Sequence, residues 1–345
     1  MNPYCSIVAN AKLLNPSELT LNNVCRVSSQ LAQHDLNSEG NALHLDEVLF
    51  TDYFPEKNLF DLLHLKDKID AITNQEVKQI CLSAWFFILE DCSNRKKDGN
   101  GLATRPSPVT DALSFYLNKL DEIVCDYRHN PLSKRVFAKT AINSALNFSV
   151  EAHQFSTENA KELGAVIFSP PYANSFDYFE SYKLEIVFGG LLKANEFYEG
   201  KKSMIRNYRI SYGKEIETDI HLVELLCKEV WDAIPKKEAI TGKRDGRTRL
   251  VPNMLRGYFN DMRKVLSEIH NSLCDTGKCY IVVDQSAYVG VIIPTDTILA
   301  KISEDIGFKV KYISKCRKAM TSGQQMKSFP YLKDSLRESI VCIEK

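Results

Sequence analysis

The chain has 345 residues, of which 44% are hydrophobic and 26% charged, as is ordinary for a soluble globular protein. Its 44 basic and 44 acidic side chains balance, so a surface that binds a polyanion has to be local rather than global. The ten cysteines include no CxxC pair, which predicts reduced thiols and no metal site. The chain shows neither a signal pattern nor a membrane-spanning run, which predicts a cytoplasmic protein without a membrane partner.

Helical spacing of apolar residues dominates the first part of the chain. It predicts helices over 4–14, 58–72, 74–92, 108–129 and 131–146. Asn74 is the expected N-cap of the third of these helices. Residues 15–55 are polar and irregular, so they predict no strong regular element.

From about residue 145, short strand patterns alternate with helices. Strands are expected at 146–152, 164–169, 277–286, 309–316 and 337–345. Helices are expected at 176–189, 218–234, 253–273 and 295–308. This alternation predicts an α/β fold with a mostly parallel, doubly wound sheet.

The strand pattern at 164–169 runs directly into Ser169-Pro170-Pro171-Tyr172. Two prolines cannot continue a strand, and they fix a rigid, extended turn. The carboxyl end of a parallel strand is where open α/β sheets bind their ligands. We therefore expect a functional site at this turn.

The stretch VIFSPPYANSFDYFESYKLE resembles the catalytic motif of S-adenosylmethionine-dependent amino-methyltransferases, particularly the DNA methyltransferases with Ser-Pro-Pro-Tyr. NPYCSIVANAK resembles the segment after the second strand of that fold, and VEAHQF resembles its third motif. GKCYIVVDQSAYVGVIIPTDTI resembles the region after the catalytic loop, and LRESIVCIEK resembles the final strand. The resemblance implies a Rossmann-like methyltransferase sheet, S-adenosyl-L-methionine as cofactor and DNA as substrate.

The resemblance also implies roles for single residues. Ser169 and the carbonyl of Pro170 would accept the two hydrogens of an exocyclic amine, Pro171 would be a rigid spacer, and Tyr172 would stack on an extruded base. Methyl transfer would be direct, without a covalent enzyme intermediate. The implied cofactor-binding residues are Asn2, Pro3, Glu151, Ser169 and Pro170, and the implied target-base residues are Asn174, Phe176, Tyr178, Asp284, Ser286 and Tyr288.

The identity of the methylated base stays open between two amines. Serine in the first position of the motif resembles cytosine-N4 enzymes, whereas adenine-N6 enzymes more often carry Asp or Asn there. An RNA base is a further alternative, and a catalytically inactive nucleic-acid-binding fragment is the competing class of function.

Two basic loops are candidates for phosphate contacts on a chain without net charge. Residues 94–105 contribute Arg95, Lys96 and Lys97, and residues 242–256 contribute Arg247 and Arg249. The alternative for each loop alone is an ordinary solvated charged loop.

The glycine-rich cofactor loop of the family is not found in this sequence. VFGGLLK, at 187–193, lies after the catalytic motif, so Gly189 and Gly190 are better interpreted as a helix C-terminus. We therefore expect an incomplete sheet without its first two strands, with a free apolar edge at 164–168. A smaller partner polypeptide would supply those strands, the glycine loop and the ribose-binding acid; a truncated gene fragment is the alternative.

The expected organisation has three parts. Residues 1–14 would begin the methyltransferase core, and residues 15–140 would form a mainly helical insertion that could recognise the target. Residues 141–345 would form the catalytic core, with a helical, basic insertion at about 195–250.

Overall fold

The computed structural model describes residues 2–33, 49–98, 101–131, 138–174, 176–206, 215–319 and 323–345. The chain divides into two compact units. Unit 1 comprises Met1–Ile142 and Asp177–Gly200, and unit 2 comprises Asn143–Phe176 and Lys201–Lys345. All ten cysteines are free thiols. No helix in the described ranges combines the length and the apolar composition needed to cross a membrane.

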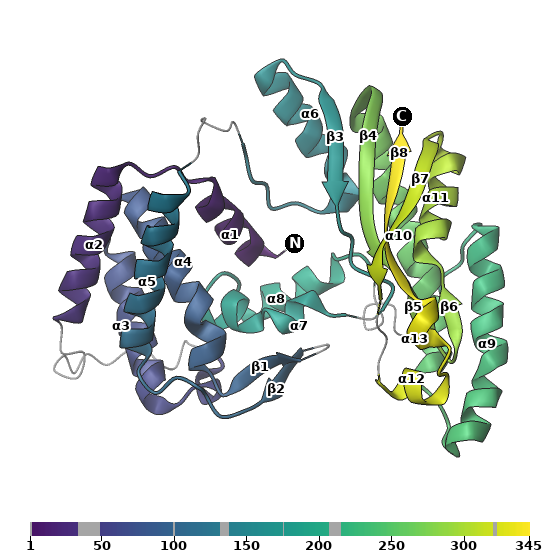
Figure 1. The fold of residues 1–345 in the computed structure, drawn as a ribbon, viewed down its shortest axis with the longest axis horizontal. Coiled ribbons are helices and arrows are strands. Elements are labelled where there is room, and N and C mark those ends of the chain that lie inside the picture. The colour runs from purple at the N-terminus through teal and green to yellow at the C-terminus, as the bar shows by residue number, and fades with distance from the viewer. Residues whose placement is uncertain are drawn as a thin grey trace. The chain divides into compact units, whose positions relative to one another are not determined.

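Unit 1 is built around a buried helix, α4 (Figure 1). The indole of Trp85 on this helix is buried and donates a hydrogen bond to the Leu62 carbonyl over 2.8 Å. Asn74 caps the helix, its side chain accepting from the Val77 amide over 3.1 Å. The elements of unit 1 are α1 (Pro3–Leu13), α2 (Glu18–Ala32), the 3-10 turn η2 (Thr51–Tyr53), α3 (Glu56–Asp70), α4 (Gln75–Cys92), the hairpin β1 (Arg95–Asp98) and β2 (Gly101–Thr104), α5 (Ala112–His129), α7 (Tyr178–Ser181), the π-helical turn η4 (Leu184–Phe188) and α8 (Ala194–Lys202), which ends at the unit boundary.

Four helices of unit 1 confirm the sequence-based expectations for 4–14, 58–72, 74–92 and 108–129. The helix expected at 176–189 forms as α7 and η4, and Gly189 is the C-cap residue of η4. Two expectations are wrong. The interval 15–55 contains the helix α2, capped by Ser17 and buried along one side by Leu21 and Val24, whereas residues 34–48 lie outside the described part.

The helix expected at 131–146 is the second error. Residues 138–144 have no regular structure and only Ala145–Asn147 form a 3-10 turn, η3, while 132–137 lie outside the described part. The proline at 131 suits a helix start, but Asn143 and Ser144 accept hydrogen bonds from nearby backbone amides, which competes with helix formation. Asn143 Oδ1, for example, accepts from the Ser144 amide over 2.7 Å.

Unit 2 contains a four-stranded sheet in the order β3-β4-β8-β7 (Figure 1). Its strands are β3 (Leu163–Phe168), β4 (Leu273–Asp284), β7 (Lys309–Lys318) and β8 (Arg337–Glu344). β3 and β4 are parallel, but β8 runs antiparallel to both β4 and β7. The expectation of a mostly parallel sheet is therefore wrong: the sheet is mixed. β7 ends and β8 begins at the same end of the sheet, so the two neighbouring strands run antiparallel.

The core of unit 2 lies between one face of this sheet and its helices. The helix α10 buries Leu255, Phe259 and Met262, and β4 contributes Cys279 and Ile281. The remaining elements are α6 (Phe148–Asn159), α9 (His221–Thr241), η5 (Thr248–Leu250), α10 (Val251–Ser272), the hairpin β5 (Ser286–Tyr288) and β6 (Val291–Ile293), α11 (Thr295–Ile306), α12 (Gly323–Ser328) and α13 (Leu332–Ser335).

The strand expected at 146–152 is wrong, because this segment enters the helix α6. The apolar residues of this segment alternate as in a strand, at Leu146, Phe148, Val150 and Ala152. They also fit a helix, in which Ala152 is buried and Val150 faces solvent. The other expected strands and helices of this unit are present, with ends that differ by a few residues.

The opposite face of the sheet exposes apolar side chains on its two outer strands. Ile167, Tyr280, Cys342 and Tyr312 stand opposite one another on β3, β4, β8 and β7, so their side chains share one face. Ile167 is 75% exposed and Tyr312 is 50% exposed at the two outer strands, whereas Cys342 between them is buried.

Candidate active site

The strand ends of unit 2 bring several predicted residues to one edge of the sheet. β3, β4 and β7 end at this edge, and β8 begins there because it runs the other way. Asp284 on β4 is in register with Glu338 on β8, and Glu338 is in register with Arg317 on β7. A carboxylate, a second carboxylate and a guanidinium therefore stand side by side where the Ser-Pro-Pro-Tyr turn leaves β3.

The turn is attached to unit 2 at both of its ends. The Ser169 hydroxyl is exposed and lies within donating distance of the Val282 carbonyl, at 3.0 Å, and of the Tyr172 hydroxyl, at 3.2 Å. Pro170 is buried, and the Ala173 carbonyl accepts a hydrogen bond from the Tyr288 hydroxyl over 3.0 Å. These contacts and the two fixed proline φ angles make the turn a rigid support for its side chains.

Tyr172 is held by a residue from the far end of the chain. Its hydroxyl donates to Glu338 Oε1 over 3.3 Å, and Arg317 Nε lies 2.5 Å from Glu338 Oε2. Burial, together with the negative charge of Glu338, raises the pKa of Tyr172, so the phenol stays protonated. Glu338 thus fixes the orientation of the ring that the resemblance assigns to base stacking.

Asp284 carries a carboxylate with unused hydrogen-bonding capacity. Within the described residues its Oδ1 atom is buried and has no hydrogen-bond partner. Burial is the main cause that raises the pKa of Asp284, and the neighbouring charge of Glu338 adds to it. An acceptor of this kind could bind an amine hydrogen near Ser169.

A buried hydrogen-bond network supports this edge from below. Asp296 at the start of α11 is fully buried and accepts from Gln285 Nε2 over 2.9 Å, from Arg337 Nε over 2.8 Å and from Ser339 Oγ over 2.9 Å. Gln285 follows Asp284 in the chain, and Arg337 precedes Glu338. The network therefore holds Gln285, which follows Asp284, and Arg337 and Ser339, which flank Glu338.

Sequence analysis missed Glu338, Arg317 and Asp296. The first two lie at strand ends of the same edge, and charged residues at strand ends were a signal that could have found them. Asp296 shows no sequence signal of its own, because its importance depends on burial.

The remaining target-base residues are divided between the units. Ser286 and Tyr288 lie on β5 beside the edge, and Ser286 is buried. Asn174 is exposed, and its Oδ1 accepts from the Phe176 amide over 3.2 Å. Tyr178 belongs to unit 1 and begins α7.

The residues expected to bind the cofactor do not form one site within either unit. Asn2 and Pro3 begin α1 in unit 1, where Asn2 Oδ1 accepts from the Tyr4 amide over 3.0 Å as an N-cap. Glu151 is in unit 2, and the strand-end position expected for it is wrong. It lies in the first turn of α6, and its carboxylate accepts from Asn143 Nδ2 over 2.8 Å.

The basic residues at 95–97 lie on β1 in unit 1. Lys96 is exposed, whereas the Arg95 guanidinium lies 3.9 Å from the centre of the Tyr53 ring. Lys97 Nζ lies 2.6 Å from Glu185 Oε1 and 3.1 Å from Glu90 Oε2. Of these three cations, Lys96 is the one that presents its charge most openly to solvent.

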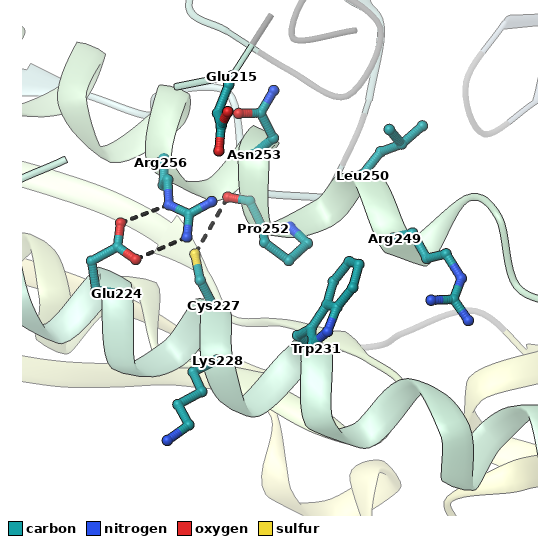
Figure 2. Close-up of a pocket in the computed structure, with 10 residues that line it drawn as sticks. All are labelled: Glu215, Glu224, Cys227, Lys228, Trp231, Arg249, Leu250, Pro252, Asn253 and Arg256. Atoms are coloured by element: carbon teal, nitrogen blue, oxygen red, sulfur yellow. Dashed lines mark hydrogen bonds and ion pairs between the residues drawn. The ribbon is translucent and has the colours of Figure 1, made fainter. Parts of the chain in front are cut away.

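The basic loop 242–250 joins α9 and α10 in unit 2. Arg247 is exposed, but Arg249 pairs with Glu238, with Nη2 2.9 Å from Oε1. A cavity of about 520 Å³ lies beside this loop. Arg249 and Trp231 line one side of it, and the ion pair of Arg256 with Glu224, Nε 2.6 Å from Oε1, lines the other (Figure 2).

Comparisons with known proteins agree with the motif. The chain is similar to the Type II methyltransferase M.AvaI of Nostoc sp. and of Anabaena variabilis, with 24% identity over 315 residues that cover 81% of this chain and 62% of either relative. It is also similar to the Type II methyltransferase M.BsoBI of Geobacillus stearothermophilus, with 32% identity over 206 residues that cover 54% of this chain and 39% of the relative.

The chain thus spans less than two thirds of the length of these relatives. It matches no family model and no solved structure. The similarity to two kinds of Type II methyltransferase supports the resemblance to methyltransferases that the Ser-Pro-Pro-Tyr segment carries.

Proposed function

We propose that unit 2 provides the catalytic face of a DNA methyltransferase that transfers the methyl group of S-adenosylmethionine to an exocyclic amine. The observation that carries the proposal is the Ser169–Tyr172 turn at the carboxyl end of β3, held by Val282 and Glu338. The relatives named as methyltransferases support the reaction class.

The side chains at the edge suit the activation of an amine. The lone pair of an exocyclic amine is delocalised into the base ring, so the nitrogen is a poor nucleophile. Ser169 Oγ and the Pro170 carbonyl would accept its two hydrogens and favour a more tetrahedral nitrogen, and the free Oδ1 of Asp284 is a further acceptor. Tyr172 would stack on the extruded base in the orientation that Glu338 fixes.

The residues present do not by themselves build a site for S-adenosylmethionine. The Asn2 side chain caps α1, Glu151 lies in a helix, and the sequence contains no glycine-rich loop of the family's kind. In this proposal the chain's own residues bind and orient the base.

We further propose that a partner polypeptide completes the cofactor site by pairing with β3. In the described part of the chain β3 pairs on one side only, and its residue Ile167 is an exposed apolar side chain. A free, apolar sheet edge favours the addition of another strand. The partner would bring the glycine loop and the ribose-binding acid, with an apolar interface like a divided domain core.

Cytosine N4 is the proposed methyl acceptor, because serine occupies the first position of the motif. Adenine N6 is the alternative. Mass spectrometry of nucleosides from treated DNA distinguishes N4-methylcytosine from N6-methyladenine, and methylated adenine alone would overturn the cytosine assignment.

The decisive experiment is transfer of tritiated methyl from S-adenosylmethionine to DNA. The chain is assayed alone and together with a candidate partner that carries the glycine loop. We expect incorporation only with both, and its loss in Tyr172→Ala but not in Tyr198→Ala, a control in the exposed part of α8. Activity of the chain alone would refute the partner proposal, and full activity of Tyr172→Ala would refute the assigned site.

A nucleic-acid-binding module without catalysis is the second candidate. The incomplete cofactor site and the exposed cation Arg247 favour it. This candidate predicts that the chain binds DNA but transfers no methyl group, whether or not the partner is present.

A further inference from the structure

A second cavity lies entirely within unit 1, and it has a volume of about 710 Å³. This size is within the range of small-molecule sites. Aromatic side chains form much of its wall: the Tyr4 ring centre is 5.5 Å from that of Phe86 and 5.6 Å from that of Tyr182. A site with such walls favours a flat ring.

The polar end of the cavity contains Glu185 and Lys97. Glu185 is 2% exposed and lies in the π-helical turn η4, an irregularity that is frequent at functional sites. Its Oε1 accepts from Lys97 Nζ over 2.6 Å, but among the described residues its Oε2 has no hydrogen-bond partner. A buried carboxylate oxygen without a partner is costly, and a ligand donor would satisfy it.

The charge in the cavity limits the ligand class. Three carboxylates, on Glu90, Asp91 and Glu185, and two ammonium groups, on Lys12 and Lys97, line the cavity. Asp91 Oδ1 lies 3.0 Å from Arg105 Nη2, so the remaining charges of the lining balance. Burial alone would lower the pKa of Lys97, but Glu185 and Glu90 outweigh burial and raise it, so the ammonium remains charged. A lining without net positive charge does not favour a phosphate, whereas an acceptor beside a donor suits a neutral ring that carries an amine.

We propose that this cavity binds an amino-bearing nucleobase, adenine or cytosine. Its exocyclic amine would donate to Glu185, and its adjacent ring nitrogen would accept from Lys97. In uracil and thymine the corresponding carbonyl and N–H reverse this order, so they would oppose acceptor to acceptor and donor to donor. The base would come either from a nucleic-acid strand or from a free nucleoside. The inference does not depend on methyl transfer.

The first test is selectivity of the full-length chain, measured by saturation-transfer NMR and calorimetry. We expect cytidine and adenosine to bind at least about tenfold more tightly than uridine. Equal binding of uridine would overturn the proposal. Binding of putrescine but of no nucleoside would also overturn it, because it would make the cavity a cation site. Displacement of the nucleosides by S-adenosylhomocysteine at equal or greater strength would assign the cavity to the cofactor instead.

The second test uses Glu185→Gln, which keeps the shape and removes the carboxylate. The amide oxygen of the new side chain can still accept from Lys97, and Glu90 keeps that ammonium paired, so we expect little change in the unfolding temperature while cytidine affinity falls about tenfold. Glu224→Gln, which alters another carboxylate paired with a cation, is the matched control. Unchanged cytidine binding in Glu185→Gln would refute the assignment.

Deoxycytidine and two short oligonucleotides distinguish the source of the base. An oligo-dC strand that binds more tightly than deoxycytidine, with oligo-dT at background, indicates a base presented by nucleic acid. Equal binding of deoxycytidine and oligo-dC indicates a nucleoside site. Failure of cytidine, adenosine, deoxycytidine and oligo-dC to bind, with the chain folded by circular dichroism, would overturn the proposal.

Discussion

Replacing Asp296 with alanine removes the acceptor on which three donors converge. Asp296, Gln285 and Ser339 are buried, whereas the Arg337 side chain is 38% exposed and stays partly solvated when Asp296 is lost. A buried donor left without its acceptor costs roughly 1–3 kcal/mol, and Gln285 and Ser339 both lose theirs, so we expect a loss of roughly 2–6 kcal/mol. For a unit of this size each kcal/mol lowers the unfolding temperature by about 2–4 °C, so we expect a fall of roughly 4–24 °C.

The assay is calorimetric unfolding at pH 7, with hydrogen–deuterium exchange of peptides from β4 and β8 to assign the loss to unit 2. Asp305→Ala is the matched control, because it removes an exposed carboxylate from the last turn of the same helix, α11. It should change the free energy of unfolding by less than about 0.5 kcal/mol. A loss under about 1 kcal/mol in Asp296→Ala would refute the reasoning.

The pH dependence of this loss has a defined sign. Burial alone would raise the pKa of Asp296, but the hydrogen bonds from Gln285, Arg337 and Ser339 outweigh it and hold the pKa below its usual 3.8. A depressed pKa means that the carboxylate stabilises the folded state above about pH 4 and loses that contribution as pH falls further. The difference between the wild type and Asp296→Ala should therefore be constant from about pH 5 to 7 and shrink in acid. A difference that grows in acid would contradict the network.

Three further predictions concern other parts of the chain. Gly189→Ala should destabilise unit 1 by about 1–3 kcal/mol in urea unfolding followed by Trp85 fluorescence, because the added Cβ would lie 2.4 Å from the Phe86 ring. Gly246→Ala meets open space and should have almost no effect. Arg247→Gln should lower the slope of log affinity for DNA against log salt by about 1 in fluorescence anisotropy. Ile167→Lys should leave unfolding unchanged but abolish association with the proposed partner in analytical ultracentrifugation, because a charge would replace an exposed apolar residue on the edge strand.

Each of these three has an outcome that contradicts it. Equal stability of the two glycine variants would show that the chain around Gly189 adjusts to an added Cβ at little cost in free energy. An unchanged salt slope would remove Arg247 from the DNA contacts, and a partner that still binds Ile167→Lys would remove β3 from the interface.

Local sequence patterns predict the strand and turn that carry the site, because the residues that define them are contiguous in the chain. The strand at 164–168 and the prolines after it need no distant residue to define where Ser169 and Tyr172 stand. The contact of Tyr172 with Glu338 spans 166 positions of sequence, and no local pattern encodes such a pairing. The roles assigned to Ser169, Tyr172 and the basic loops remain predictions.

Strand direction and short apolar alternations mark where sequence reasoning failed. An apolar strand has the same sequence pattern whether its neighbours are parallel or antiparallel. The sequence of β8 therefore does not indicate that this strand runs antiparallel. The alternation from Leu146 to Ala152 covers too few residues to separate a period of two from a helical period. Burial, which decides between them, depends on the helix α10 that packs there more than a hundred residues later.

The position of β8 has a consequence for the order in which unit 2 can be made. Among the described residues β8 is made after the other three strands of its sheet, yet it lies between β4 and β7 and pairs with both. During translation β7 therefore has no neighbour in the sheet until residues 337–344 have left the ribosome. Until then, the buried residues Val341 and Ile343 have no counterpart on β4. A nascent chain stalled before residue 337 should bind chaperones and be cut readily by proteases. Once residues 337–344 have emerged, both chaperone binding and protease cleavage should decline.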